Sequence, residues 1–474
     1  MKKTVNCIVL ICIIFSGLCG GAFSGLAESN IKKFSTRLTL YGSIYWYSVP
    51  NDERKVYVWI PPEMKTVRGL IFVGNPGTGD NLLWLYNNDI KTFAARMGFG
   101  LMTTKGMDGT KTFTENGEII IRALEEISQA GLNPEMRNVP FITSGGSSGG
   151  AAGYGLANYA PQRTIAFTVN VPSTPYVPSN PVPAALKVPG IFIAGEWDVI
   201  LPSTALEMRS IARKSRAQGS LWSWMIYQGM GHEHRLTGHF YYPFWEKMIN
   251  LRCPKDADPL QGPIRLKDVA ESKGWLAEDL SYPHRSAWTA ESVAGWEAWG
   301  FKAGDPYNMH VSCKTGLVGI APYAKYRDNK TRACWLPDQD MAFLFRALAS
   351  WNPMLSLGIE GYKVVWKDAD PLKAVRLAFT DTKIYRPGDT IKLVCTVAPE
   401  FTGWSKIEFY LGSKKIGVVK AKDAAGPTKA ELSYTLKPQP VAQSFTVLGY
   451  DAKGKPVSSA HMINILIIGE KGDK

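Results

Sequence analysis

The sequence predicts an α/β protein: a doubly wound, mostly parallel sheet, followed by an irregular extension and a small all-β sandwich. Three observations predict it. At 474 residues the chain is too long for one ordinary core. Between residues 69 and 251, short apolar runs alternate with longer helical stretches, which is typical of a parallel sheet covered by helices. From residue 373 onward, short alternating runs are separated by turn residues, as in a sandwich.

The N-terminus has the three-part layout of a secretory signal peptide, in which MKK precedes an apolar segment and then small residues. We expect the signal peptide to occupy 1–27, with cleavage after Ser24 or Ala27, so that the mature protein is exported. Lipidation at Cys19 is disfavoured because Leu18 stands where such signals carry a small residue. No other stretch is long and apolar enough to predict a transmembrane span.

Composition excludes several classes of protein. A hydrophobic content of 45% with 15 tryptophans excludes a mainly disordered chain. The formal charge of +13 is scattered without an arginine-rich tract, so we expect no nucleic-acid partner. The cysteines after the signal peptide are Cys253, Cys313, Cys334 and Cys395, and they lack metal-ligand spacing. A bridge between Cys313 and Cys334 is our first choice in a compartment that allows disulfides.

The first domain is expected to begin with an antiparallel hairpin over 37–60, where polar and apolar residues alternate on both sides of a turn at 50–52. The expected buried strands are 69–74, 98–103, 139–143, 164–170, 190–194 and 222–227. The expected helices lie near 80–96, 115–130, 148–158, 203–217 and 239–251. This alternation predicts helices on both faces of the sheet.

Three motifs follow predicted strands in the order serine, acid, histidine. Residues 139–150 read VPFITSGGSSGG, a G-x-S-x-G pattern in which glycines give room for a sharp turn from strand to helix. GEWD follows at 195–198 and GMGHEH at 229–234. This is the chain order of a serine-hydrolase triad.

Residues 37–251 resemble an α/β-hydrolase of the dienelactone-hydrolase and secreted-esterase type, on the strength of GGSSGG, GEWD, GMGHEH and the early turn VGNPGTGD. The resemblance implies a catalytic domain over 28–251 that cleaves esters. At 172–188, where many relatives insert a helical lid, this chain has a short proline-rich segment. Such a segment cannot form a large cap, so the site would suit a bulky or polymeric substrate.

Two serines satisfy the motif, Ser147 and Ser148. In relatives the apolar strand ends about two residues before the leading glycine, which favours Gly145 as that glycine and Ser147 as the nucleophile. Choosing Ser148 would place polar Thr143 and Ser144 in the buried strand.

A serine needs a general base, and the doubly wound segment offers His232, His234 and His239. His232 is the expected base because it follows a strand and a flexible glycine-rich turn; His234 is the alternative, and His239 is expected to start the last helix. The resemblance points to Asp198 as the acid that orients the imidazole, with Glu196 as the alternative.

The oxyanion hole needs two backbone N–H groups. We expect one from Ser148, directly after the nucleophile. The other should come from the loop after 69–74, where Pro76 has no N–H and Gly77 or Thr78 must serve instead. No cofactor or metal is implied.

The extension, 252–372, has no fold that the sequence assigns, and we expect it to pack on the catalytic domain. It carries tryptophans suited to stacking on sugars or to filling a core: Trp275, Trp288, Trp296, Trp299, Trp335, Trp351 and Trp366. Residues 373–474 are similar to the immunoglobulin-like modules of bacterial extracellular enzymes, and we expect a separable, non-catalytic sandwich.

These features together predict a secreted serine hydrolase that cleaves carboxylic esters through an acyl-enzyme, with an acylated polysaccharide as the favoured substrate. Polyester or lipid esters and, last, peptides are the alternative substrates. An alternative of another class is a catalytically inactive glycan-binding or surface protein on a hydrolase fold.

Overall fold

The structure is a computed structural model that describes residues 31–74, 81–107, 113–171, 180–195, 202–227, 238–279 and 314–466. Shorter gaps fall at 352–354, 361–363, 369–375, 381–384, 400, 402, 425, 438–441 and 462–464. The predicted signal peptide, 1–27, lies outside the described residues. Among the helices that are described, none is long and apolar enough to cross a bilayer.

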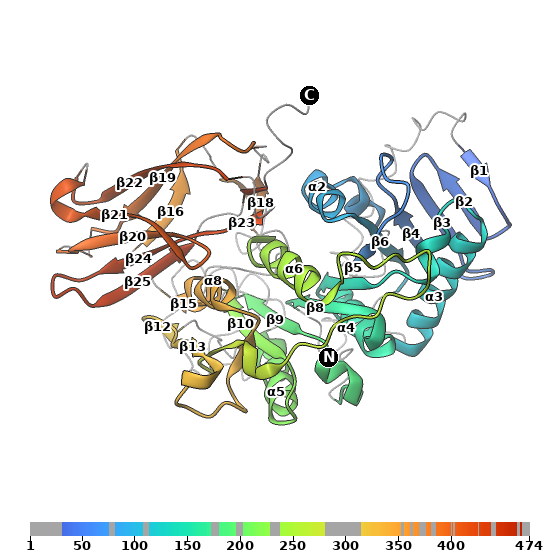
Figure 1. The fold of residues 1–474 in the computed structure, drawn as a ribbon, viewed down its shortest axis with the longest axis horizontal. Helices are drawn as coiled ribbons and strands as arrows, with labels where there is room; N and C mark the ends of the chain where they lie inside the picture. Colours follow the sequence, from blue (N-terminus) through green and yellow to red (C-terminus); the bar gives the residue numbers. More distant parts are fainter. Residues whose placement is uncertain are drawn as a thin grey trace, which may run out of the picture.

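A ten-stranded mixed sheet forms the centre of the first part of the chain, in the order β1-β2-β3-β4-β6-β5-β7-β8-β9-β10 (Figure 1). The antiparallel strands are β1 (Ile31–Lys33), β2 (Leu38–Tyr41), β3 (Ile44–Ser48) and β4 (Lys55–Trp59). The parallel strands are β5 (Gly69–Gly74), β6 (Phe99–Lys105), β7 (Phe141–Gly146), β8 (Thr164–Asn170), β9 (Gly190–Gly195) and β10 (Trp222–Tyr227). The predicted hairpin and all six predicted buried strands are confirmed, with end differences of three residues or fewer.

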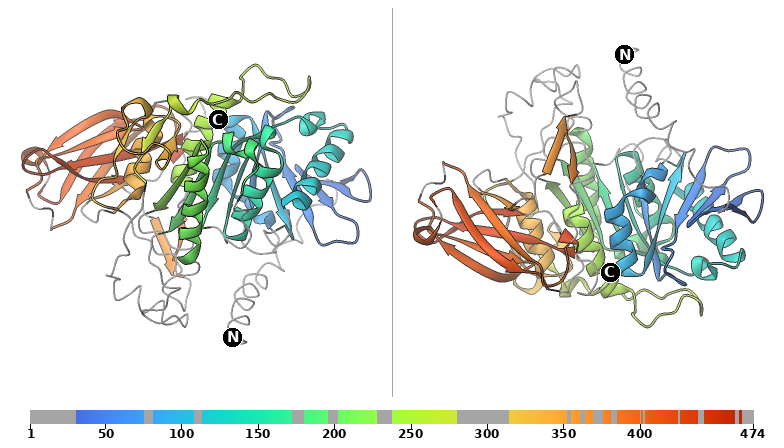
Figure 2. Two further views of the ribbon diagram at one scale, coloured as in Figure 1. Left: turned by 90° about the horizontal axis from the view of Figure 1, so that it is seen from below. Right: turned by 90° about the horizontal axis from the view of Figure 1, so that it is seen from above.

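Helices cover both faces of this sheet (Figure 2). One face carries α2 (Asn88–Met97) and α6 (Gly238–Arg252), and the other carries α3 (Phe113–Gln129), α4 (Ser148–Tyr159) and α5 (Pro202–Ala217). The five predicted helical stretches are therefore present. The first is divided into a 3-10 helix, η2 (Asn81–Tyr86), and α2, because the Asn87 side chain accepts hydrogen bonds from two backbone N–H groups and caps α2. The other 3-10 helices of this part are η3 (Pro134–Arg137), η4 (Pro161–Arg163) and η6 (Pro183–Lys187).

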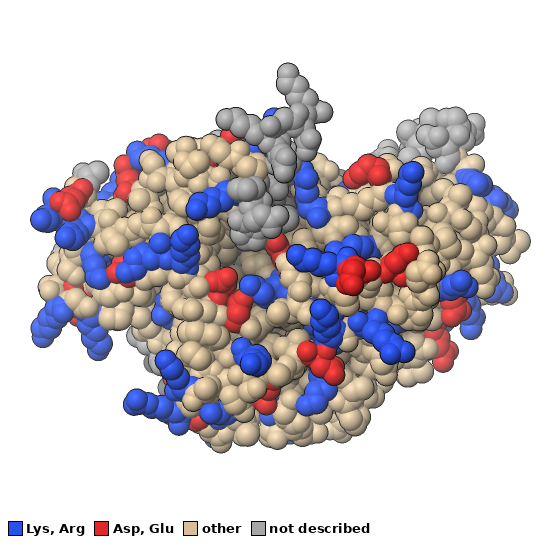
Figure 3. Space-filling view, in the orientation of Figure 1, with Lys and Arg blue, Asp and Glu red and all other residues tan. Residues whose placement is uncertain are grey.

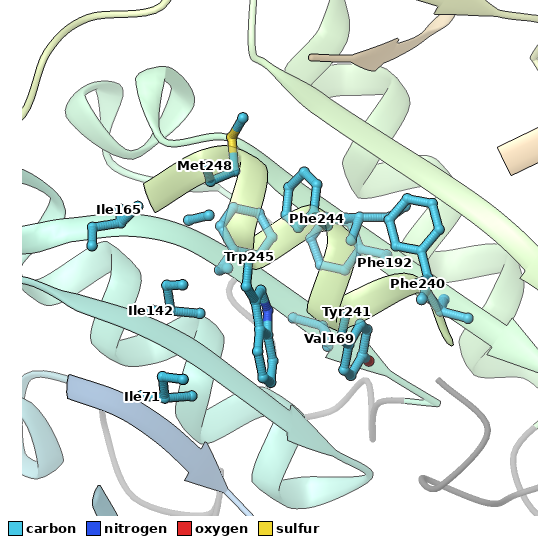
Figure 4. Packing of buried hydrophobic residues seen from close by; sticks show 14 of the residues in the cluster. Ile71, Ile142, Ile165, Val169, Phe192, Phe240, Tyr241, Phe244, Trp245 and Met248 are labelled. Carbon is cyan, nitrogen blue, oxygen red and sulfur yellow. The ribbon is translucent and has the colours of Figure 1, made fainter. Parts of the chain in front are cut away.

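Aromatic side chains fill the space between the sheet and its helices. On one face, α6 places Phe244, Trp245 and Met248 over the strands (Figure 4). On the other, the rings of Tyr154 and Trp222 meet edge to face, with their centroids 5.8 Å apart. Each such side chain contributes roughly 1.5–3 kcal/mol through burial, so this core holds the parallel strands rigidly beneath the loops at their carboxyl ends.

The extension adds short elements to the last strand of the sheet. These are η7 (Glu271–Lys273), β11 (Trp275–Ala277), β12 (Lys314–Thr315), β13 (Ile320–Pro322), η8 (Tyr323–Lys325), β14 (Cys334–Leu336), α8 (Gln339–Ala349) and β15 (Ser350–Trp351). The buried side chain of Arg216 in α5 connects the extension to the first part of the chain. Its Nε donates to the Ala333 carbonyl at 2.7 Å and its Nη2 donates to the Glu271 carboxylate at 2.7 Å. The described part of the extension therefore contacts α5 beside the large sheet. Trp335 is only 2% exposed and fills a core, so it is not available to stack on a sugar.

The C-terminal part is all-β. One sheet contains β16 (Leu355–Ile359), β19 (Thr390–Val397) and β22 (Lys429–Thr435), and another contains β20 (Lys406–Leu411), β21 (Lys414–Lys420), β24 (Phe445–Tyr450) and β25 (Pro456–His461). Two further pairs are β17 (Val364–Asp368) with β18 (Arg376–Thr380), and β23 (Ala442–Gln443) with β26 (Ile465–Leu466); η9 (Ala421–Asp423) is a 3-10 turn. Because β16 pairs with β19, this part begins before residue 373, earlier than expected.

The C-terminal part is joined to the rest of the molecule through buried contacts. Ala442 packs in the same hydrophobic core as the aromatic residues of α6, which is called the main core below. Its N–H donates to Glu246 of α6 at 2.9 Å. The N–H of Ser413 donates to Asp340 of α8 at 2.8 Å. These contacts argue against the separable module that the sequence suggests, because local alternation of residues does not reveal which outer surfaces become buried.

The predicted Cys313–Cys334 bridge is wrong. Cys334 carries a free thiol that donates to the Trp224 carbonyl at 3.2 Å. Burial raises the pKa of this thiol to about 12. The side chain therefore behaves as a small buried hydrophobe in the contact between β14 and β10.

Candidate active site

The strands that precede the predicted site segments all end at one edge of the sheet. From β5 the chain continues to β6 on one side, and from there to β7 on the other, so the direction of winding reverses beside β5. In open α/β sheets, ligands bind outside the carboxyl ends of the strands at such a point. The segments 75–80, 147–148, 196–201 and 228–237 follow directly after the carboxyl ends of β5, β7, β9 and β10.

Ser147 lies at the turn between β7 and α4 in a strained backbone conformation. Its φ of 50° and ψ of −130° lie in a region that favours glycine. The Ser147 N–H donates to the Asn170 carbonyl at 3.0 Å, and its carbonyl accepts from Gly150 at 3.0 Å. Strain of this kind costs about 1–3 kcal/mol and persists only where the surroundings enforce it, most often at functional sites.

The glycines of the motif let α4 approach the sheet closely. A Cβ on Gly145 would lie 2.2 Å from the Gly149 carbonyl oxygen, and one on Gly74 would lie 2.3 Å from the same atom. A Cβ on Gly153 would lie 2.9 Å from the carbonyl oxygen of Ser144. The first turn of α4 therefore rests directly on β5 and β7, which is the arrangement that a nucleophile elbow requires.

The reason given from the sequence for preferring Ser147 is wrong. β7 continues to Gly146, so Thr143 and Ser144 do lie in the strand, where they are 0% and 3% exposed. The buried hydroxyl of Ser144 is tolerated here because Thr168 of the neighbouring strand donates a hydrogen bond to it, and a pattern of apolar residues does not predict such a contact. What separates the two serines in the structure is conformation: Ser147 has the positive φ, and Ser148 is the first residue of α4.

The position of Ser148 is electrostatically favourable for an anion. The N-terminus of a helix carries partial positive charge and N–H groups that point along the axis. Because Ser148 starts α4 next to Ser147, a negatively charged group bound beside Ser147 would lie close to this helix end.

Most of the other predicted site residues lie outside the described residues: Asp198 and its alternative Glu196, His232 and its alternative His234, and Gly77 and Thr78 of the oxyanion loop. His239 is the second residue of α6, which confirms that it starts the last helix. Among the described residues, no group of histidine, cysteine and carboxylate side chains has the arrangement of a metal site.

Val171, which directly follows β8, is a second strained residue at this edge of the sheet. This fully buried valine has a φ of 38°, which is a true outlier for a β-branched residue. Its N–H donates to the Ile193 carbonyl at 2.7 Å. No pattern in the sequence marks the position, because a valine at the end of a buried strand is ordinary.

Comparisons with known proteins identify no family. No protein-family model matches the chain, and no curated protein is significantly similar to it. Among solved structures, Thermogutta terrifontis esterase 2 phosphorylated by paraoxon is 16% identical, with a TM-score of 0.30, and the match covers 48% of this chain and 92% of that one. S-formylglutathione hydrolase from Staphylococcus aureus is 12% identical, with a TM-score of 0.32, over 44% of this chain and 94% of that one. Esterase rPPE is 15% identical, with a TM-score of 0.31, and the match covers 44% of this chain and 78% of that one.

Proposed function

We propose that the protein is a serine hydrolase that cleaves carboxylic esters, with Ser147 as the nucleophile. The observation that carries the proposal is the backbone of Ser147, which has a φ of 50° at a strand-to-helix turn beside the winding reversal of the sheet. A non-glycine residue is kept in such a conformation where its side chain must project from a sharp turn.

In the proposed mechanism, His232 takes the proton of the Ser147 hydroxyl while the serine oxygen attacks the ester carbonyl. Asp198 orients the imidazole and stabilises its protonated form. Ser148 and either Gly77 or Thr78 donate N–H groups to the oxyanion. The imidazolium gives its proton to the departing alcohol, and water, activated by the same imidazole, then releases the acid from the acyl-enzyme.

For the substrate, we favour an ester of an acylated polysaccharide, processed outside the cytoplasm after removal of 1–27. The short proline-rich segment at 172–188 supports an uncapped site with room for a polymer. The C-terminal all-β part would serve as an immunoglobulin-like accessory domain. Polyester or lipid esters are the second choice, and a panel of acetylated and feruloylated glycans beside short-chain lipids would distinguish the two classes.

Replacement of each serine in turn tests the nucleophile. Ser147→Ala should abolish turnover of a small aryl ester and labelling by a fluorophosphonate, with an unchanged thermal unfolding midpoint. Ser148→Ala is the matched control and should retain turnover, because the backbone N–H of residue 148 remains. An active Ser147→Ala beside an inactive Ser148→Ala would move the nucleophile by one residue. A folded wild-type protein that neither turns over esters nor reacts with the label would favour the glycan-binding alternative.

A further inference from the structure

Three buried polar side chains connect α6 to the strand that ends at the proposed nucleophile. The indole Nε1 of Trp245 donates to Thr168 Oγ1 at 3.2 Å, and Thr168 Oγ1 donates to Ser144 Oγ at 2.9 Å. Trp245 belongs to α6, Thr168 to β8 and Ser144 to β7, and each is 3% exposed or less. Figure 4 shows the Trp245 side chain extending from α6 toward the strands.

Thr168 has a partner on either side. An indole N–H can only donate, so Thr168 Oγ1 accepts from Trp245, and its own hydroxyl proton is directed to Ser144 Oγ. If Thr168 lost its hydroxyl, the Trp245 N–H would lose this acceptor and Ser144 would lose this donor. An unsatisfied buried polar group is expensive, so the three side chains hold one another in a single arrangement.

The polar pair occupies a specific level of the sheet. Ser144 and Thr168 are register partners near the carboxyl ends of their strands, whereas the pair two positions earlier, Ile142 and Ala166, is apolar. Two residues beyond Thr168, the Asn170 carbonyl accepts the N–H of Ser147. The hydroxyls therefore lie at the level of the sheet directly below the proposed site, where apolar side chains would otherwise fill the core.

We propose that Trp245, Thr168 and Ser144 are positioning residues that fix α6 at a set height over β7. This proposal rests on the proposed function. α6 begins at Gly238, directly after the segment 228–237 that carries His232 and His234. The network sets where Gly238, the first residue of α6, lies relative to Ser147, and through it the approach of the proposed base to the proposed nucleophile.

The test compares Thr168→Val with Thr164→Val, using kcat and KM for an aryl ester. Thr164 lies in the same strand, is fully buried and donates to the Ala160 carbonyl at 2.9 Å, but it lies at the opposite end of β8. Both variants lose one buried hydroxyl, so both thermal unfolding midpoints should fall, and that of Thr168→Val should fall further because two buried side chains lose their partner. A small misplacement of reacting groups reduces rates strongly, so Thr168→Val should lower kcat about tenfold with KM changed less than about twofold.

Rescue and a second variant complete the experiment. Thr168→Ser retains the hydroxyl, so its kcat should be close to that of the wild type. The kcat of Thr164→Val should also stay close to that of the wild type. Ser144→Ala is a smaller change that should lower kcat in the same way, and it decides the matter if Thr168→Val does not fold. Equal kcat in Thr168→Val and Thr164→Val, or an unchanged Ser144→Ala, would overturn the positioning role while leaving the proposed function intact. A wild type without esterase activity would overturn both.

Discussion

At the scale of single residues, two adjacent strands of the large sheet are each followed by a residue with a strained backbone conformation. Ser147 follows β7 with a φ of 50°, and Val171 follows β8 with a φ of 38°. Each is tied to the next strand through its N–H, Ser147 to Asn170 and Val171 to Ile193. The neighbouring strand end therefore holds each strained residue in place, which explains how non-glycine residues can keep these conformations.

The close packing beneath Ser147 gives a prediction about Gly145. In Gly145→Ala the added Cβ would lie 2.2 Å from the backbone oxygen of Gly149, which no rotamer change can relieve. We expect α4 to shift, with loss of ester turnover and a decrease in the free energy of unfolding of about 1–3 kcal/mol, measured by urea titration. Gly358→Ala is the control, because nothing lies within 4 Å of its added Cβ. Comparable losses in both variants would contradict the close contact.

At the scale of secondary-structure elements, the alternating strands and helices were predictable and the extension was not. A buried strand such as β8 is a short continuous run of mostly apolar residues, and an amphipathic helix such as α3 repeats its apolar residues with the helical period. The positions of both therefore follow from local sequence. The extension is held by contacts between distant residues, as Arg216 shows by bonding to Ala333, 117 positions away. Local patterns contain no record of such a contact.

The site was predictable to a similar degree. The G-x-S-x-G pattern correctly predicted a strand-to-helix turn at Ser147, because glycines at those spacings have a direct steric role. The structure does not describe Asp198 or His232, so their roles stay predictions. The hydrogen bond between Thr168 and Trp245 was not predicted, because the two residues are 77 positions apart and a contact over that distance leaves no local sequence pattern.

Within the C-terminal sheet of β20, β21, β24 and β25, a buried carboxylate joins three strands. Glu408 is 3% exposed and accepts hydrogen bonds from Lys406, Lys415, Tyr410 and Tyr450. Burial by itself would raise the pKa of Glu408, but these four donors outweigh it and hold the pKa at about 2. The carboxylate is therefore stabilised in its charged form and links β20 with β21 and β24.

This arrangement predicts how stability depends on pH. Because the pKa of Glu408 is lowered from 4.5 to about 2 on folding, its contribution is complete above pH 4.5 and is lost as the pH falls toward 2. Glu408→Gln should destabilise the protein at pH 7 by roughly 3 kcal/mol, and its difference from wild type should shrink through that window in urea titrations. Glu431→Gln, a partly exposed carboxylate between Lys392 and Lys429, is the control and should change the stability less. A difference that is independent of pH would contradict the assignment.

At the scale of the whole molecule, the parts form one continuous structure. α8 of the extension lies between the large sheet and the C-terminal sheets (Figure 1). The ring centroids of Phe343 in α8 and Tyr410 in β20 are 5.4 Å apart. Basic and acidic side chains are interspersed over the face shown in Figure 3, without one continuous basic track. A nucleic acid binds such tracks, so this face offers no support for a nucleic-acid partner.

This continuity leads to a prediction about truncation. Removing residues 373–474 would delete Ala442 from the main core. Glu246, which is only 7% exposed, would then lose the hydrogen bond that it accepts from the Ala442 N–H. It would also leave β16 without β19, and α8 without Tyr410. We expect the truncated chain to unfold at a clearly lower temperature and to lose ester turnover, because each kcal/mol lost lowers the midpoint by about 2–4 °C.

A full-length variant, Glu246→Leu, separates this connection from the bulk of the deletion. It removes the acceptor of the Ala442 N–H while the C-terminal sheets remain, so it should show part of the thermal loss of the truncation. Lys414→Met, an exposed change on β21, is the control and should leave the midpoint unchanged, because its side chain lies in solvent at the far edge of that sheet. If the truncated chain keeps the full midpoint and turnover, the C-terminal part is an independent module and its contacts with α6 and α8 contribute nothing to the stability of the rest of the chain.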